Sequence, residues 1–428
     1  MKLTIIAIGS RGDVQPIVAL GRGLSDAGYT VRMVTLESFE AMVRKQGLEF
    51  FPVEGDAQSL TRDMMVAGTK GNGLHLLAMY RGIMRTFGAI TESYQRSFAA
   101  DALRDSDAIL SQLPGGFYGY DLAEALRVPY IALSVIPQEI TGAWPLSLLP
   151  STFSLGARYN RLTYLFAQQL AWHPFRKSIN EFRRQLGLPP ASFWWGNIRR
   201  LARDRIPVIQ GFSEHVIPTQ PEWGDHVQTT GYWALDESDW SPPEALTAFL
   251  EAGDPPVFVG FGSMPVPDPP QTTAHIVAAL ERSGRRGILH AGWAKLGAVD
   301  LPGSVFPLDY APYAWLFPRM AAVVHHGGSG TTGFALRSGV PSLVVPFTAD
   351  QPFWGKRTHD LGVGPAPLPF PKLNGELLAR AITEMLEDTA MHRQAAQLRD
   401  RMAAESGVQR AVTIIQQVLG WPFKSPRS

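Results

Sequence analysis

The stretch VVHHGGSGTTGFALRSGVPSLVVPFTADQPFWGKR, from Val323 to Arg357, decides the fold. The apolar run Met320 to Val324 predicts a buried strand, and a glycine-rich turn from His326 to Thr332 follows it. The next residues have helical spacing as far as Arg337, and the apolar run Ser342 to Phe347 predicts another buried strand. The stretch therefore predicts a strand, turn, helix and strand of an α/β sheet.

A glycine turn between a strand and a helix can hold phosphate. Glycines let the backbone approach a ligand, N–H groups point at it, and the helix dipole favours negative charge. His326 can add a hydrogen bond or a positive charge. Many such turns are only structural, so both interpretations stay open. The turn lacks the Lys of an NTPase loop, and the N-terminal turn from Gly9 to Asp13 lacks the pattern G-x-G-x-x-G.

Length and composition limit the classes of protein. A chain of 428 residues is too long for one ordinary core and predicts two domains. A formal net charge of +1 gives no electrostatic case for nucleic acid or an anionic membrane as partner. The absence of Cys excludes disulfides, a thiolate zinc site and a cysteine nucleophile, and it suits a cytoplasmic location. No stretch is long and apolar enough to span a bilayer. Peripheral contact with a membrane stays open.

The two halves of the chain repeat one α/β pattern. Leu3 to Ile8 predicts a strand, Val14 to Ala27 a helix, and Tyr29 to Leu36 a second strand, which begins a doubly wound parallel sheet. In the second half, Pro256 to Phe261 predicts a strand and Thr272 to Arg282 a helix. We therefore expect two facing Rossmann-like domains, with a cleft between them for a nucleotide and a second substrate.

Further elements follow the same alternation. We expect strands at Ala108 to Ser111, Tyr130 to Ser134, Val208 to Gly211 and Gly287 to His290, and helices at Gly375 to Leu386, Met391 to Ala404 and Val408 to Leu419. The region 218–243 is rich in Pro, Trp, Asp and Thr, and it predicts a linker. The expected parts are an N-terminal domain at 1–217, this linker, a C-terminal domain at 244–407, and a terminal helix at 408–428.

An aromatic insertion from Pro145 to Trp195 breaks the alternation. Leu155 to Leu170 and Phe175 to Leu186 have helical spacing and predict two helices. These helices could pack in a core, or they could line a pocket for an apolar molecule. We favour the pocket, because insertions in such domains often carry specificity.

Two acidic positions are candidates for chemistry. Asp13 lies where the first helix is expected to begin, so it could cap that helix or act as a general base toward a substrate hydroxyl. Asp350 and Gln351 follow a predicted strand, at the edge where parallel sheets bind ligands, and could hold vicinal hydroxyls of a sugar. His325 and His326 do not predict a metal site, because adjacent residues point apart and no third ligand is nearby.

These motifs together resemble the nucleotide-sugar-dependent glycosyltransferases of the GT-B fold, and within them the sterol 3β-glucosyltransferase type and its bacterial natural-product relatives. The resemblance covers nearly the whole chain outside the region Leu60 to Arg205, and the combination of motifs is specific. The matching stretches are GSRGDVQPIVALGRGL (Gly9 to Leu24), GLEFFPVEGD (Gly47 to Asp56), VFVGFGSMPVPDP (Val257 to Pro269), HHGGSGTTGFALRSGVPSLVVPFTADQPFWGKR (His325 to Arg357) and LGVGPAPLP (Leu361 to Pro369).

The resemblance implies inverting transfer of a sugar, usually glucose, from a UDP-sugar to a hydroxyl of a hydrophobic acceptor. It implies Asp13 as the catalytic base and Asp350 and Gln351 as contacts of the donor sugar. No cofactor or metal is expected, and the partners are a nucleotide sugar and a hydrophobic acceptor, without nucleic acid. The residues assigned to the donor diphosphate are Ser10, Arg11, Gly12, Ser263, His326, Gly328, Ser329, Gly330, Thr331 and Thr332. The aromatic residues proposed to contact the acceptor are Trp144, Phe153, Phe166, Trp172 and Phe175.

Two departures from the family pattern matter. Phe334 stands where plant enzymes carry a Glu that holds ribose, so recognition of ribose must differ and UDP over TDP is less secure. Asp13 stands without an N-terminal His partner, which leaves a carboxylate of low intrinsic basicity. The alternatives are a transferase of TDP-deoxysugars or of a lipid-linked precursor, a nucleotide-sugar epimerase, and a non-catalytic partner of a natural-product glycosyltransferase.

Overall fold

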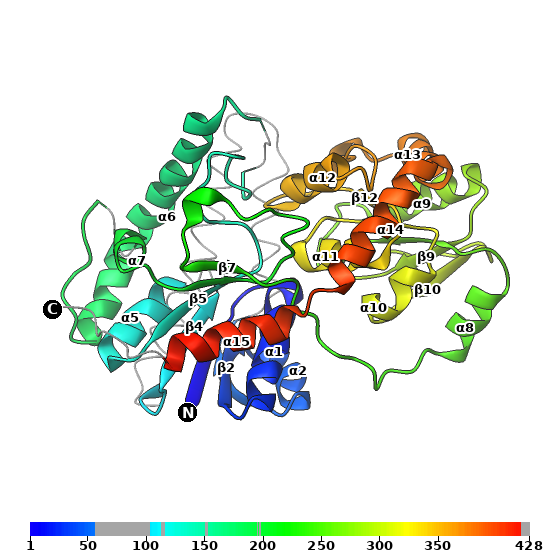
Figure 1. Ribbon diagram of the computed structural model, residues 1–428. Helices are drawn as coiled ribbons and strands as arrows, with labels where there is room; N and C mark the ends of the chain where they lie inside the picture. The colour runs from blue at the N-terminus through cyan, green and yellow to red at the C-terminus, as the bar shows by residue number, and fades with distance from the viewer. Residues whose placement is uncertain (56–102, 113–115, 150–152, 195, 197, 421–428) are drawn as a thin grey trace. The chain divides into compact units, whose positions relative to one another are not determined.

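A computed structural model describes residues 1–55, 103–112, 116–149, 153–194, 196 and 198–420. The chain divides into two compact units (Figure 1). Unit 1 comprises Met1–Leu146, Phe153–Leu235 and Ser406–Ser428, and unit 2 comprises Ser147–Thr152 and Asp236–Glu405. Each unit contains one parallel sheet, which confirms the predicted fold class of two α/β domains.

Unit 1 is built on a seven-stranded sheet with the order β3-β2-β1-β4-β5-β6-β7, and every pair of strands is parallel. Its central strands are buried along their whole length, as expected when helices cover both faces of a parallel sheet. Its elements are β1 (Lys2–Ile6), α1 (Arg11–Asp26), β2 (Thr30–Leu36), α2 (Glu40–Lys45), β3 (Glu49–Val53), β4 (Ala108–Gln112), α5 (Gly116–Leu126), β5 (Tyr130–Ser134), α6 (Ala157–Gln185), α7 (Ile198–Arg203), β6 (Val208–Gln210), β7 (Val227–Thr229) and α15 (Gly407–Gly420).

Helix α1 begins three residues earlier than its apolar spacing predicts. Ser10 is the N-cap residue, so Asp13 occupies the third helical position instead of the cap. The helix tolerates Pro16 and buries one apolar face against the sheet. The C-terminal helix α15 packs on α1, and a Cβ at Gly23 would lie only 2.4 Å from Val408 Cγ1. Gly23 therefore lets these two helices, nearly four hundred residues apart in sequence, approach closely.

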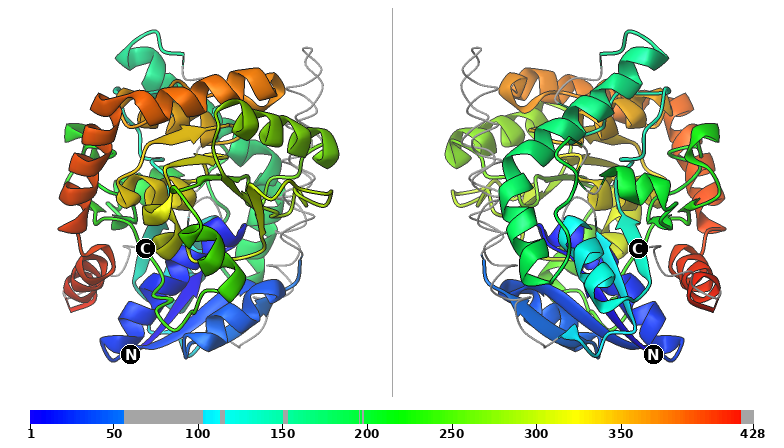
Figure 2. Two further views of the ribbon diagram at one scale, coloured as in Figure 1. Left: turned by 90° about the vertical axis from the view of Figure 1, so that its right-hand side faces the viewer. Right: turned by 90° about the vertical axis from the view of Figure 1, so that its left-hand side faces the viewer.

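The aromatic insertion forms one helix instead of the two predicted. Helix α6 has 29 residues and contains Pro174. The right-hand view of Figure 2 shows it as one continuous helix. The side chains of Tyr164, Trp172 and Phe182 are buried along one side of it. Tertiary packing of these aromatic rings offsets the cost of proline in the helix interior.

The strand β7 and the 3-10 helix η3 (Pro221–Trp223) lie within the range expected to be a linker. β7 has only three residues and pairs with β6 at the edge of the sheet. A strand this short has too few residues for a period-2 pattern, so the sequence gives no sign of it.

Unit 2 is built on a five-stranded parallel sheet with the order β10-β9-β8-β11-β12. Its elements are α8 (Glu244–Glu251), β8 (Val257–Gly260), α9 (Pro269–Arg282), β9 (Gly287–His290), β10 (Val305–Leu308), α10 (Tyr313–Leu316), β11 (Ala322–His325), α11 (Ser329–Ser338), β12 (Ser342–Val344), α12 (Gln351–Asp360), α13 (Gly375–Glu387) and α14 (Thr389–Ala403). The deciding stretch thus forms β11, α11, β12 and α12, although β12 ends at Val344 instead of Phe347.

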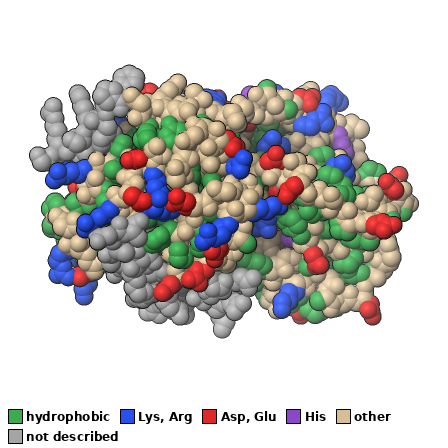
Figure 3. Space-filling view, turned by 90° about the horizontal axis from the view of Figure 1, so that it is seen from below, with side chains coloured by type: hydrophobic (Ala, Val, Ile, Leu, Met, Phe, Trp, Pro, Cys, Tyr) green, Lys and Arg blue, Asp and Glu red, His purple; other side chains and the backbone are tan. Residues whose placement is uncertain are grey.

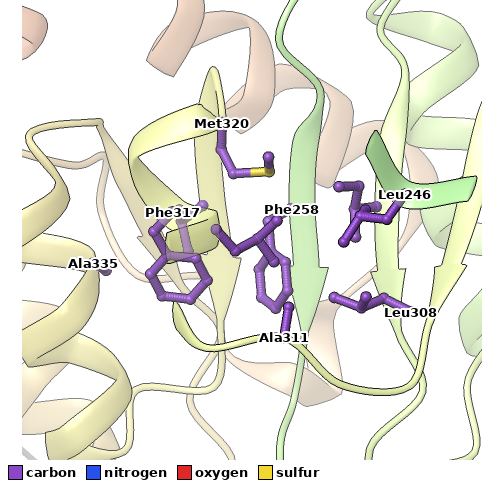
Figure 4. Packing of buried hydrophobic residues seen from close by; sticks show 10 residues of the cluster. Leu246, Phe258, Leu308, Ala311, Phe317, Met320 and Ala335 are labelled. Carbon is purple, nitrogen blue, oxygen red and sulfur yellow. The ribbon is translucent and has the colours of Figure 1, made fainter. Parts of the chain in front are cut away.

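One face of the unit 2 sheet is covered by an aromatic and aliphatic core. The ring of Phe258 packs edge-on against the ring of Phe317, with 4.9 Å between their centroids. Figure 4 shows Leu246, Met320, Leu308 and Ala311 around these rings. Because this core sits beneath β8 and β11, it fixes the two strands whose loops form the site described below.

Among the described residues, no helix is long and apolar enough to cross a bilayer. Figure 3 shows basic and acidic side chains interspersed over one face of the molecule, in keeping with the formal net charge of +1.

A buried group of one basic and two acidic side chains joins helices α5 and α6 of unit 1. Arg183 on α6 is 1% exposed, pairs with the fully buried Asp121 on α5, and places Nη1 2.9 Å from Glu124 Oε2. Its Nε also donates to the carbonyl of Pro189 at 2.7 Å. We predict that Arg183→Met lowers the free energy of unfolding of unit 1 by about 3–5 kcal/mol, because it removes the cation that neutralises a buried carboxylate.

The matched control is the neighbouring Arg184, whose side chain is 74% exposed and pairs with Glu181. Arg184→Met should change the free energy of unfolding by less than about 1 kcal/mol. Urea unfolding followed by circular dichroism measures both variants, and equal effects would contradict the assignment.

Candidate functional site

The order of strands in unit 2 predicts that a ligand binds at the carboxyl ends of β8 and β11. The chain proceeds from β8 outward to β9 and β10 and then returns to the other side of β8 as β11. Ligands of doubly wound sheets bind at the carboxyl ends of the strands where the direction of winding reverses. The loop that follows β8 contains Ser263, and the loop that follows β11 contains His326. Ser263 and His326, two of the residues predicted to bind the diphosphate, therefore lie at the position that the topology selects.

The backbone of two glycines lies close to the ring of His326. A Cβ at Gly262 would approach His326 Cε1 to 3.0 Å, and one at Gly328 would approach His326 Nε2 to 2.6 Å. Gly327 adopts a φ of +91°, and a Cβ there would meet Val344 Cγ1 at 2.5 Å. The glycines of the motif are therefore required partly to admit the His326 ring, which is 7% exposed.

Both histidines of the motif are neutral near pH 7. Burial, with a smaller contribution from the nearby His290, lowers the pKa of His326 to about 4. Burial likewise lowers the pKa of His325 to about 3. His326 can therefore contribute a hydrogen bond but not the positive charge that the sequence left open, and its Nδ1 is buried without a hydrogen-bond partner. His325 Nδ1 accepts a hydrogen bond from the Gly327 N–H at 3.1 Å, which fixes the turn.

Helix α11 presents its N-terminus directly after this turn. Gly328 is its N-cap, and residues Ser329, Gly330 and Thr331 form the first turn, whose N–H groups precede the hydrogen-bond ladder of the helix. Such groups and the helix dipole favour an anion. Thr332 differs from the others, because it is fully buried and its hydroxyl and N–H both donate to the Gly328 carbonyl, at 3.0 and 2.9 Å. Its position gives Thr332 a role in holding the turn.

Gln351 ties two loops of the site together. Its Oε1 accepts hydrogen bonds from the N–H groups of Phe347 and Thr348, at 2.7 and 3.1 Å. Its Nε2 lies 3.0 Å from Sδ of Met264, in the loop after β8. The side chain is 4% exposed, and these contacts involve both ends of its amide. Its contact with a sugar stays a prediction.

Asp350 is the N-cap of α12 and is only partly buried. Its Oδ2 accepts a hydrogen bond from Trp354 Nε1 at 2.7 Å, and that contact holds the carboxylate beside the start of the helix.

Phe334 stands at the position where the sequence lacks the expected ribose-binding Glu. Its ring packs edge-on against the ring of Tyr313, with 6.2 Å between the ring centroids. Phe334 therefore belongs to the core of unit 2.

The second candidate site, in unit 1, is the start of α1. This turn also follows a reversal of winding, because β1 lies between β2 and β4 in the sheet. Asp13 Oδ2 accepts hydrogen bonds from the Ser10 N–H at 2.8 Å and from the Ser10 hydroxyl at 2.9 Å. A Cβ at Gly9 would lie 2.4 Å from Asp13 Oδ2, so glycine is required where the carboxylate folds back.

Burial raises the pKa of Asp13, while hydrogen bonds from Ser10 and Gln112 act against that rise. Gln112 ends β4 and is 4% exposed, and it was missed as a site residue. A polar residue at the carboxyl end of a fully buried strand was the available signal.

The residues Ser10, Arg11 and Gly12 lie in this turn of unit 1, whereas the other predicted diphosphate residues lie in unit 2. The Ser10 hydroxyl already donates to Asp13, and Arg11 and Gly12 are exposed. Their contact with a diphosphate stays a prediction.

The five aromatic residues predicted to contact an acceptor do not share one environment. Trp172 is fully buried, and its Nε1 donates to the Phe193 carbonyl at 2.9 Å, so its ring belongs to the core of unit 1. Phe153 and Phe166 are 60% and 67% exposed. The remaining two residues, Trp144 and Phe175, are partly buried.

A further carboxyl in this region was missed. Glu139 follows β5, and burial raises its pKa to about 7. Its charge acts on the hydroxyl of Tyr164, which is also close to Trp144. Glu139 thus lies near Tyr164 and Trp144, and Trp144 is one of the two partly buried residues predicted to contact the acceptor. Within the described ranges, no group of three His, Asp or Glu side chains is arranged to hold a metal ion.

Two family models match the chain. The Glycosyltransferase family 28 N-terminal domain matches residues 3–143. The Erythromycin biosynthesis protein CIII-like, C-terminal domain matches residues 288–418. The first match contains Asp13 and Gln112, and the second contains His326 and Gln351.

Solved structures share the fold. The calicheamicin glycosyltransferase superposes with a TM-score of 0.70 at 19% identity and covers 99% of both chains. A Streptomyces glycosyltransferase solved with thymidine diphosphate superposes with a TM-score of 0.63 at 20% identity, covering 97% of this chain and 99% of that one. The fold is therefore that of the GT-B glycosyltransferases.

Curated relatives define the family more narrowly. A sterol 3-beta-glucosyltransferase of Arabidopsis thaliana is 35% identical, over 100% of this chain and 70% of its own length. Another of the same plant is 37% identical over 96% of this chain and 64% of its own length. The enzyme of that name from Emericella nidulans is 36% identical over 98% of this chain, which spans only 30% of the fungal protein. The chain belongs to the sterol 3-beta-glucosyltransferase family.

The buried histidines predict how the stability of unit 2 changes with pH. Burial lowers the pKa of His326 in the folded state from the ordinary value of 6.5 to about 4. The folded state is therefore most stable, with respect to this group, above pH 6.5, and that stability is lost as the pH falls from 6.5 toward 4. We therefore expect unit 2 to lose up to about 1.4 kcal/mol per pH unit for each such histidine.

Urea midpoints measured from pH 7 to pH 4 check this slope. His326→Gln should make it shallower. An unchanged slope in the His326 variant would show that the pKa of His326 is not lowered in the folded state.

The contacts of Gln351 predict a role in positioning the loops. Gln351→Leu removes two hydrogen bonds to backbone N–H groups, so we expect a loss of about 2 kcal/mol in stability and a higher KM for the donor. Gln351→Glu keeps the acceptor oxygen and should restore most of that stability. The control is Gln397→Leu on the exposed side of α14. A rise in KM with unchanged stability would favour direct contact with the sugar instead.

Proposed function

We propose that this protein transfers glucose from UDP-glucose to the 3β-hydroxyl of a sterol, with inversion at the anomeric carbon. The observation that carries the proposal is the match to sterol 3-beta-glucosyltransferases over nearly the whole chain, at 35% identity and 70% of the length of one of them. The starts of α1 and α11 are included in that match, and we propose that they supply the chemistry that the reaction needs.

In the proposed reaction, the donor diphosphate binds at the start of α11. The first-turn N–H groups at 329–331 and the neutral His326 donate to its oxygens, where negative charge grows as the bond to the sugar breaks. Because these donors are fixed by the fold, they need no reorganisation during the reaction. We propose that they replace a divalent ion, so that transfer needs no metal and a chelator leaves turnover unchanged.

Asp13 is the proposed general base. The sterol oxygen attacks the anomeric carbon, its proton passes to the Asp13 carboxylate, and the electron pair of the broken C–O bond leaves with UDP. Burial favours this role because it raises the pKa of the carboxyl, while the hydrogen bonds from Ser10 and Gln112 orient it. Phe334 lies in the core of unit 2, so the proposal for UDP rests on the family and not on a ribose contact.

The partners that we propose are therefore a nucleotide sugar and a lipophilic acceptor, without nucleic acid, in the cytoplasm. A non-catalytic partner protein is the weaker alternative, since the chain keeps Asp13 and His326 together with the turns that hold them.

We predict that Asp13→Asn lowers kcat by about 10²–10⁴-fold with little change in the affinity for UDP. The amide keeps an oxygen for the hydrogen bonds from Ser10, so the start of α1 should remain folded. UDP release from UDP-glucose and from TDP-glucose, with a sterol as acceptor, measures the rate, and mass spectrometry identifies the product.

The matched control is Asp26→Asn at the exposed end of the same helix. Wild-type turnover by the Asp13 variant at saturating sterol would refute the base assignment. Failure of the wild-type protein to release UDP with any sterol would refute the proposed function itself.

A further inference from the structure

The exposed apolar side chains of this protein are concentrated in one segment. Of the twelve large hydrophobic residues that are exposed in the described part of the chain, nine lie between Leu148 and Trp194. Scattered exposed apolar residues are normal, but a concentration of them marks an interaction surface.

Helix α6 arranges these side chains on one side. Leu162, Phe166 and Leu170 recur at four-residue intervals and are 61%, 67% and 45% exposed, and Leu165 is 38% exposed beside them. Residues at this spacing share one face of a helix. The opposite face is buried in unit 1 through residues such as Tyr164, so the apolar face points outward from unit 1.

Two aromatic residues extend this surface. Phe193 and Trp194 are 53% and 63% exposed, and both rings contact the ring of His173 on α6, with centroids 6.0 and 6.2 Å away. The guanidinium of Arg176 lies 3.9 Å above the ring of Phe193. We call the surface of Leu162, Leu165, Phe166, Leu170, Phe193 and Trp194 the α6 face.

Along α6 itself, every charged side chain before Glu181 is basic, although Glu222 of another segment pairs with Arg161. The sequence contains no Asp or Glu between Glu139 and Glu181, although the whole chain has nearly equal numbers of acidic and basic residues. Exposed basic residues stand at both ends of the apolar stripe, with Arg158 before it and Lys177 after it. Apolar side chains with basic neighbours and an exposed Trp are the features of a helix that lies in the interface of an anionic bilayer.

We propose that the α6 face docks this protein on the surface of a membrane that contains anionic lipids. Leucine and aromatic side chains of the face enter the boundary between headgroups and acyl chains, while Arg158 and Lys177 meet lipid phosphates. A second copy of the chain fits the face less well, because a symmetric contact brings the same basic residues together. The proposal concerns binding to lipid and does not depend on sugar transfer.

Vesicle flotation of the full chain tests the proposal without donor or acceptor. The wild-type protein should float with phosphatidylcholine vesicles that contain phosphatidylglycerol, and much less with pure phosphatidylcholine. The double variant Leu162→Glu with Leu170→Glu should lower the partition coefficient by about tenfold or more, because two carboxylates enter the apolar stripe. The variant Arg158→Glu with Lys177→Glu should remove the preference for anionic vesicles.

The control is Val299→Glu, at a 43% exposed apolar residue of unit 2 outside the α6 face. It should bind vesicles as the wild type does. All variants should keep the wild-type urea midpoint, which separates lost binding from misfolding.

The proposal is overturned if the wild type does not float, or if the leucine double variant floats as well as the wild type. A second result would also overturn it. Neither protein would float with vesicles, while light scattering would show that the wild type self-associates and that the leucine double variant is monomeric. In that case the α6 face joins copies of the chain. UDP release from a water-soluble sterol derivative is measured in parallel, so failure of docking and failure of sugar transfer are distinguished.

Discussion

The close approach of backbone to the His326 ring is the constraint on which unit 2 depends. The ring fits only because Gly262 and Gly328 have no Cβ. A Cβ at Gly262 would lie 3.0 Å from Cε1 of the ring, and a Cβ at Gly328 would lie 2.6 Å from Nε2. The two glycines belong to loops that follow different strands, β8 and β11. Gln351 ties the loop after β8 to the loop after β12 by hydrogen bonds to backbone N–H groups and a contact with Met264. Three loops are therefore held around one buried, neutral side chain.

Unit 1 uses the same principle with a carboxylate in place of the imidazole. Asp13 folds back over Gly9, where a Cβ would lie 2.4 Å from its Oδ2, and Ser10 holds it with two hydrogen bonds. In both units the glycine follows a strand at a reversal of winding, so the topology supplies the position and the glycine supplies the space. In the proposed reaction, a polar group held in this way is already oriented before the substrate arrives.

The local pattern of the sequence predicted β1, α1, β8, β11, α11 and β12 together with their glycine turns, because buried strands and glycine turns have strong local signals. It did not predict α12, the helix that begins at Gln351. The long helix α6 was divided in two because Pro174 interrupts the apolar spacing, and only packing of Trp172 and Phe182 shows that it continues. The neutral state of His326 could not be predicted, since it depends on burial by distant loops and on His290. For the same reason Gln351 was expected to face a ligand, whereas its partners are backbone groups and Met264.

The opposite pKa shifts of the two sites have one physical cause. Burial disfavours the charged form, so it lowers the pKa of His326 and raises that of Asp13. In the proposed reaction each shift serves its own task. A neutral His326 and the start of α11 stabilise a leaving diphosphate with dipoles, and no full positive charge holds the product afterward. A more basic Asp13 accepts the sterol proton more readily, provided that it is ionised when the acceptor binds. Because His326 does not titrate near neutral pH, it should not contribute to the pH dependence of transfer in that range.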